Sequence, residues 1–306
     1  MPTAPSTRLN VHKPGQEGQV ALAAAIAAAG LITVTSLRPR IPPWETMWLM
    51  AGCLFGFFKW LTWSRRSTRC FATRAASAWG YVCGWVGLDA DEFCRGAASF
   101  RPSGIREWAL AFGMTLLGAA VLWGLVRRLP ADRTIVIGGV GFAGLLLLLH
   151  FGLFHLLALA WRRIGAGVSP IMRLPLLATS LADFWGQRWN RAYRRVSFDY
   201  FFRPAVRRFG PAAGTVIAFF ASGLIHELVI SVPAGAGYGG PTVYFVVQGL
   251  GLLLERTAAC RRLTYSFPLG GWLYTLAFVL GPVALLFHEP FLTRVIVPFL
   301  EVIGAR

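Results

Sequence analysis

Two short segments of this chain carry residues whose types and spacing could do chemistry. The segment 184–190 reads Phe-Trp-Gly-Gln-Arg-Trp-Asn and combines aromatic rings, a cation and an amide. His226 and Glu227 lie farther along, inside an apolar run from Val216 to Val232 that is long enough to help cross a bilayer. Ionisable side chains are costly in hydrocarbon, so those found there usually serve a function. The two segments together indicate group transfer carried out within a membrane.

His226 is the first candidate for a catalytic group. Ser222 and His226 are four residues apart and would share one face of a helix, with the small Gly223 beside them. A neutral imidazole in a dry cavity is a suitable general base. Glu227 is turned by about 100° from His226, where it could bind substrate, orient another group or pair with an arginine. The alternative for His226 is a packing histidine hydrogen-bonded between helices.

The basic segment 183–210 is the second candidate region. Arg188, Arg191 and Arg195 repeat at helical spacing, so we expect them to share one helix face. Arginine forks grip phosphate through paired hydrogen bonds, and the interleaved aromatic rings could stack on an adenine. The segment could therefore dock a phosphate-bearing acyl donor such as acyl-CoA. It could equally be an interfacial helix that anchors the protein to anionic lipid headgroups.

The remaining residues of the motif fit a substrate site. Asn190 could donate a hydrogen bond to an oxyanion or hold a substrate carbonyl; alternatively it caps a helix or bonds a neighbouring helix. Phe184, Trp185 and Trp189 supply the aromatic rings of the same motif.

Other polar residues predict little chemistry. His150 and His155 are five residues apart with no carboxylate near them in the sequence, so we expect structural roles or a lining of the same cavity, and no metal site. The cysteine count of 5 is odd and no CxxC pair occurs, which predicts no disulfide framework and favours cysteines as small core residues.

These candidates need helices that cross a membrane. Apolar residues make up 56% of the 306 residues and charged residues only 14%, far from a soluble average. We predict an all-α polytopic membrane protein with a disordered N-terminus over 1–18 and one domain over 19–306. About 20 apolar residues span a bilayer, which predicts about eight spans at 19–37, 44–63, 108–126, 134–160, 211–232, 240–256, 270–287 and 290–303. Interfacial or re-entrant helices would lie in 64–107 and 161–210, around a buried tunnel.

The net charge of +17 comes almost wholly from arginine. Most arginines fall in short loops between apolar runs, where they set topology, so a nucleic-acid partner is not expected. An N-terminus in the cytoplasm would place the arginine-rich loops 64–107, 161–210 and 257–269 inside. The high Gly, Ala and Arg content suggests a bacterial inner membrane.

The order of these motifs resembles the membrane-bound O-acyltransferase superfamily, and within it the wax synthases, which are long-chain-alcohol O-fatty-acyltransferases. The aromatic-Gly-x-Arg-Trp-Asn run and the downstream helical histidine carry the resemblance, and Phe201 to Pro204 fits that branch too. It is strongest over 181–255. The resemblance implies that His226 is the catalytic histidine and Asn190 its partner. The aromatic and basic residues of the motif would form the acyl-CoA site, with acyl-CoA as co-substrate and no cofactor.

We therefore expect an enzyme that transfers an acyl group from acyl-CoA to the hydroxyl of a lipid or long-chain alcohol. Two alternatives remain at this stage. The same site could acetylate a small hydroxylated metabolite, or His226, Glu227 and Glu255 could relay protons in a transporter or flippase.

Overall fold

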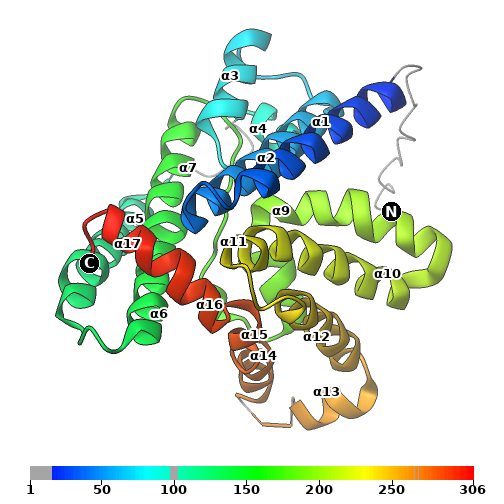
Figure 1. Cartoon of the computed structure of the whole chain (residues 1–306). Coiled ribbons are helices and arrows are strands. Elements are labelled where there is room, and N and C mark those ends of the chain that lie inside the picture. The colour runs from blue at the N-terminus through cyan, green and yellow to red at the C-terminus, as the bar shows by residue number, and fades with distance from the viewer. Residues whose placement is uncertain (1–15, 97–102, 265, 268) are drawn as a thin grey trace.

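The apolar runs fold into helices that pack against one another without a sheet. The computed structural model describes residues 16–96, 103–264, 266–267 and 269–306, and every regular element in these ranges is helical (Figure 1). Residues 1–15 of the expected disordered N-terminus lie outside the described residues. The first half of the chain forms α1 (Gln16–Leu37), α2 (Pro43–Ser64), α3 (Arg74–Gly84), α4 (Ala90–Cys94), α5 (Ile105–Ala120), η2 (Val121–Leu125), η3 (Val126–Arg128), α6 (Thr134–Leu145), η4 (Leu146–Leu153) and α7 (Phe154–Arg163).

The second half of the chain is more broken. Its elements are η5 (Pro175–Leu177), α8 (Leu181–Asp183), η6 (Phe184–Arg188), α9 (Arg191–Val196), η7 (Ser197–Phe202), α10 (Arg203–His226), η8 (Glu227–Ser231), α11 (Val232–Ala234), α12 (Gly240–Glu255), α13 (Ala258–Thr264), α14 (Gly270–Leu280), α15 (Val283–Leu286), α16 (Glu289–Phe291), η9 (Leu292–Ile296) and α17 (Val297–Val302).

Fewer helices than expected are both long and apolar enough to cross a bilayer. Within the described residues four helical stretches meet both conditions, and a fifth is added if a pair bent by 63°, Gly270–Leu286 and Glu289–Val302, counts as one span. The predicted count of about eight is therefore not confirmed. The four stretches are Gly18–Leu37, Ile105–Arg128, Thr134–Arg163 and Arg191–Ala234.

A buried lysine fastens the segment after α2. The Nζ of Lys59, which is 1% exposed, donates to the carbonyls of Tyr81 at 2.6 Å, Trp85 at 2.6 Å and Gly87 at 2.7 Å. A buried ammonium is costly unless its donors are satisfied, and here three backbone oxygens satisfy them. Lys59 thus holds α3 and the turn that follows it against α2.

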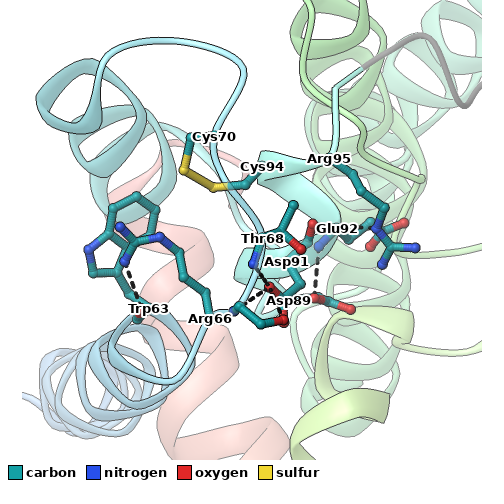
Figure 2. The surroundings of a disulfide bond; sticks show 10 residues. Trp63, Arg66, Thr68, Cys70, Asp89, Asp91, Glu92, Cys94 and Arg95 are labelled. Atoms are coloured by element: carbon teal, nitrogen blue, oxygen red, sulfur yellow. Dashed lines mark hydrogen bonds between the residues drawn. A yellow bond between two sulfur atoms is a disulfide. The ribbon is translucent and has the colours of Figure 1, made fainter. Parts of the chain in front are cut away.

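Cys70 and Cys94 form a disulfide, so the expectation of unpaired core cysteines is wrong for these two (Figure 2). The Asp91 carboxylate of α4 accepts hydrogen bonds from the backbone N–H groups of Ser67 and Thr68, both at 2.8 Å. These bonds hold the segment before Cys70 against α4, which contains Cys94. Burial alone would raise the pKa of Asp91, but these hydrogen bonds and the Arg195 guanidinium outweigh it and hold the pKa below its ordinary value. The spacing of the cysteines in the sequence did not indicate that the segments around Cys70 and Cys94 lie in contact.

A close approach of two helices positions the region of interest. α10 packs against α12, and a Cβ at Gly223 would lie only 2.7 Å from the Cα of Thr242. Any larger residue at 223 would push the two helices apart. The contact places the end of α10, with His226, beside Phe245 of α12.

Candidate active site

A cavity of about 340 Å³ lies between η6, α9, α10 and α12. This volume is within the usual range for small-molecule sites. Most of its wall is aromatic or apolar, and five of the residues predicted from the sequence line it. They are Trp185, Trp189, Asn190, Ser222 and His226.

The tautomer of His226 follows from its one hydrogen bond. Its Nδ1 lies 2.7 Å from the backbone carbonyl of Ser222. A carbonyl oxygen can only accept, so Nδ1 carries the proton and donates. The lone pair is then on Nε2. The imidazole also contacts the Phe245 ring, with centroids 4.3 Å apart, so the ring is oriented on two sides.

Asn190 reaches the same cavity through an unusual backbone conformation. It is left-handed, with φ 40° and ψ 56°, a conformation that Asn tolerates better than most residues. Its backbone N–H donates to the Met172 sulfur at 3.2 Å. Asn190 precedes α9 in the N-cap position, yet its side chain makes no capping hydrogen bond. The carboxamide therefore remains free to bond a group in the cavity.

Hydrogen bonds and ring stacking outside the cavity hold the aromatic side chains that line it. The indole N–H of Trp185 donates to the Gln248 side-chain oxygen at 3.3 Å, and the Gln248 amide donates to the Phe278 carbonyl at 2.6 Å. Trp189 stacks on Phe184 with an interplanar angle of 11°. Phe184 is itself buried and supports Trp189 from outside the cavity lining.

The three motif arginines do not all share one helix face, so that prediction is wrong for Arg188, whereas Arg191 and Arg195 both lie in α9 at the predicted four-residue spacing. Arg188 ends η6 and Arg191 begins α9, and the left-handed Asn190 breaks the helix between them. Arg188 pairs with Asp183 at 2.5 Å. Arg195 pairs with Asp89 at 3.1 Å, Asp91 at 2.9 Å and Asp199 at 3.2 Å, a junction that ties α9 to the α4 segment. Arg191 lines a different cavity.

Among the lining residues that were not predicted as site residues, Tyr193, Arg194 and Arg256 carry groups that could contact a substrate. Tyr193 follows Asn190 by three positions on α9, and its hydroxyl is buried. Arg194 also lines the cavity and donates to the Gly186 carbonyl at 3.0 Å. Arg256 lines it from the end of α12. The spacing from Asn190 could have indicated Tyr193, but the sequence holds no signal that Arg256 meets α9.

Glu227 lies outside the lining of this cavity. Its Oε1 accepts from the N–H groups of Gly239 at 2.9 Å and Thr242 at 3.1 Å, and from the Thr242 hydroxyl at 2.9 Å. The carboxylate thereby holds the start of α12. Glu255 similarly accepts from the N–H groups of Leu181 and Ala182, at 3.1 Å and 3.2 Å.

His155 has a carboxylate partner that the sequence did not reveal. Its Nε2 lies 3.2 Å from Glu107, a residue of α5. It lines a second cavity rather than the one with His226. His150 lines neither of these two cavities; it contacts Phe154 edge to face, with ring centroids 5.3 Å apart.

Comparison with known proteins gives this region a family. Residues 168–247 match the model of the membrane bound O-acyl transferase family. A probable long-chain-alcohol O-fatty-acyltransferase of Arabidopsis thaliana is 32% identical over 130 residues, which are 38% of this chain and 38% of the relative. A second Arabidopsis thaliana protein described in the same words is 27% identical over 157 residues, 49% of this chain and 46% of the relative. A long-chain-alcohol O-fatty-acyltransferase of Simmondsia chinensis is 30% identical over 135 residues, 36% of this chain and 38% of the relative.

These matches confirm the predicted resemblance. They are partial, because the chain spans less than half the length of each of these relatives. The apolar helices and the family match identify an integral membrane protein. The three relatives are plant proteins and give no support to the expected bacterial inner membrane, and their descriptions do not favour acetylation or transport.

Proposed function

We propose that this integral membrane protein, which resembles the membrane bound O-acyl transferases over residues 168–247, transfers an acyl group from acyl-CoA to the hydroxyl of a long-chain alcohol or lipid. The single observation that carries the proposal is His226. Its Nδ1 donates to a carbonyl, which leaves Nε2 as the acceptor nitrogen, and the residue lines an aromatic cavity together with Asn190.

The chemistry follows from the two side chains. Nε2 of His226 accepts the hydroxyl proton while the alcohol oxygen attacks the thioester carbonyl. The carboxamide of Asn190 donates to the oxyanion that develops on that carbonyl oxygen. When the tetrahedral intermediate collapses, the carbon–sulfur bond breaks and the imidazolium returns its proton to the thiolate of CoA. The products are an ester and free CoA, and His226 is again neutral.

The wall of the cavity suits both substrates. The aromatic residues exclude water, which protects the thioester from hydrolysis. Arg194 and Arg256 are the cations that line the cavity, so in this proposal they attract the donor's phosphates. Arg188 and Arg195 are less suited to that role, since each is already paired with carboxylates.

The test is turnover in membranes that contain the His226→Ala variant, with labelled acyl-CoA and a long-chain alcohol. We expect wild-type membranes to form a labelled ester and the variant to form almost none. His150→Ala is the matched control, because it also removes a partly buried imidazole but lies outside the cavity lining. Ester formation at the wild-type rate by His226→Ala would refute the mechanism.

A further inference from the structure

A second cavity, of about 500 Å³, lies on the other side of residues 189–191. Trp189 and Asn190 line the first cavity, whereas Arg191 lines this one. The left-handed backbone of Asn190 makes this possible, because it turns the chain between two consecutive side chains. The second cavity is thus a neighbour of the candidate active site with a separate lining.

Positive charge dominates the polar half of the second cavity. Arg162, Arg173 and Arg191 line it, and Glu107 is the carboxylate among its lining residues. That carboxylate is already engaged: Arg162 donates to it at 3.0 Å and 3.2 Å, and His155 lies 3.2 Å from it. A lining with this surplus of guanidinium groups attracts anions, and guanidinium geometry favours phosphate.

Arg191 is the cation best placed to hold such an anion. Its Nε is buried, and it has no hydrogen-bond partner among the described residues. A buried donor without a partner is costly, which calls for a ligand that the protein itself does not supply. Glu92 interacts electrostatically with Arg191, and burial raises the pKa of Glu92.

The other half of the cavity is apolar. Leu110 and Met114 of α5 and Phe151 of η4 line it. Leu110 is 38% exposed and Leu174, which also lines the cavity, is 43% exposed. The cavity therefore borders apolar surface of the kind that faces acyl chains.

The cavity also lies at the right depth for a headgroup. Glu107 stands near the start of the apolar stretch Ile105–Arg128, and Arg162 near the end of the stretch Thr134–Arg163. Both residues mark the same end of two neighbouring helices, where a bilayer changes from hydrocarbon to headgroups. Basic pockets between helices at this depth suit anionic lipids.

We propose that this second cavity binds a phosphate-bearing amphiphile, with its phosphate on Arg191 and Arg173 and its acyl chain along α5. A membrane phospholipid supplies that chemistry; the acyl-CoA donor, whose phosphates the proposed function assigns to Arg194 and Arg256 of the first cavity, is the alternative source that the test distinguishes. The inference does not depend on the proposed acyl transfer, because binding requires no reaction at His226.

The experiment measures binding to the full chain purified in detergent, by fluorescence titration or native mass spectrometry. Three probes are used: dioleoylphosphatidate, coenzyme A and dioleoylglycerol, the last of which lacks phosphate. We expect a phosphate-bearing probe to bind wild type and Arg191→Gln to weaken that binding about tenfold or more, as the loss of a charge-assisted contact implies. Arg173→Gln should weaken it as well. Arg207→Gln is the matched control, since Arg207 is exposed and lines neither cavity.

The outcome assigns the source. Loss of phosphatidate binding in Arg191→Gln identifies a membrane lipid, and loss of coenzyme A binding identifies the donor. Equal binding of both probes by Arg191→Gln and wild type overturns the proposal, as does tight binding of dioleoylglycerol. His226→Ala should bind the probe like wild type, so a failure of the proposed acyl transfer leaves this result unaffected.

Discussion

His226 lines the first cavity and His155 lines the second, and the two imidazoles differ in which ring nitrogen their hydrogen-bond partners leave unbonded. His226 gives its Nδ1 to a backbone carbonyl one helical turn earlier, at 2.7 Å, and keeps an acceptor nitrogen for a ligand. His155 directs its Nε2 to a carboxylate at 3.2 Å, which is also bound by Arg162. The residue type is the same, but the first arrangement leaves the acceptor nitrogen that the proposed mechanism uses as a base, whereas the second lies beside the ion pair of Glu107 with Arg162. The partner, rather than the histidine, separates the two roles.

The largest difference should come from removing each imidazole in turn. If general-base catalysis is worth about 10²–10⁴-fold, His226→Ala should lower ester formation by that factor. His155→Ala should lower it by less than about tenfold, because His155 does not line the first cavity. Steady-state rates with labelled acyl-CoA decide this. Equal losses in the two variants would remove the distinction between the cavities.

The next effect concerns the support of α9, which starts at the wall between the cavities. Arg195 on α9 pairs with Asp89 and Asp91, and Figure 2 shows these two carboxylates in the surroundings of the disulfide of Cys70 and Cys94. The disulfide closes a loop with a sequence separation of 24, so removing it should lower the free energy of unfolding by about 3 kcal/mol. Thermal unfolding of Cys70→Ser in detergent measures this. Cys260→Ser is the control, since Cys260 is a free cysteine.

Removal of the Asn190 amide should cost about 10²-fold in turnover, the usual loss for one oxyanion donor. Asn190→Gly is the informative variant, because glycine adopts the left-handed conformation without strain and so keeps the turn between the cavities. The expected result is a loss of turnover with unchanged binding of the anion to Arg191. A fully active Asn190→Gly would show that the amide serves only the backbone turn.

The smallest effect is a pH dependence of stability. The pKa of Asp91 is held below its ordinary value in the folded protein, so its carboxylate stabilises the fold at a pH above about 4, where the unfolded side chain is ionised. This stabilisation is lost as the pH falls through the lowered folded-state pKa. Unfolding temperatures between pH 3 and pH 7 should therefore fall on acidification in wild type and less so in Asp91→Asn. Parallel curves for the two proteins would contradict the assignment.

Local patterns in the sequence were enough to predict part of this arrangement. The helical class, the four-residue spacing of Ser222 and His226, and the neighbourhood of Asn190 and the tryptophans follow from composition and periodicity. The prediction that Arg188 shares a helix face with Arg191 and Arg195 was wrong, because the left-handed Asn190 breaks the helix between Arg188 and Arg191. A break of this kind depends on contacts such as that of Met172 with the Asn190 N–H.

The remaining features depend on contacts between residues far apart in the chain. Glu107 contacts His155. The Asp91 carboxylate accepts hydrogen bonds from Ser67 and Thr68, close to the disulfide of Cys70 and Cys94. Neither partner can be recognised from its own sequence neighbours. The second cavity was missed for the same reason, since its lining comes from α5, η4, α7, α9 and the loop before η5.

The turn at Asn190 also makes the two cavities partners in thermodynamic linkage. Residues 189–191 contribute to the lining of both cavities. A ligand that moves this backbone segment from within one cavity therefore changes the shape of the other cavity. Linkage is reciprocal. If a ligand in the second cavity changes the affinity of the first cavity for its ligand by some factor, the ligand of the first cavity changes the affinity of the second cavity by the same factor. If the second cavity binds a membrane lipid as proposed, the lipid composition of the bilayer would then change the affinity of the first cavity for its substrates.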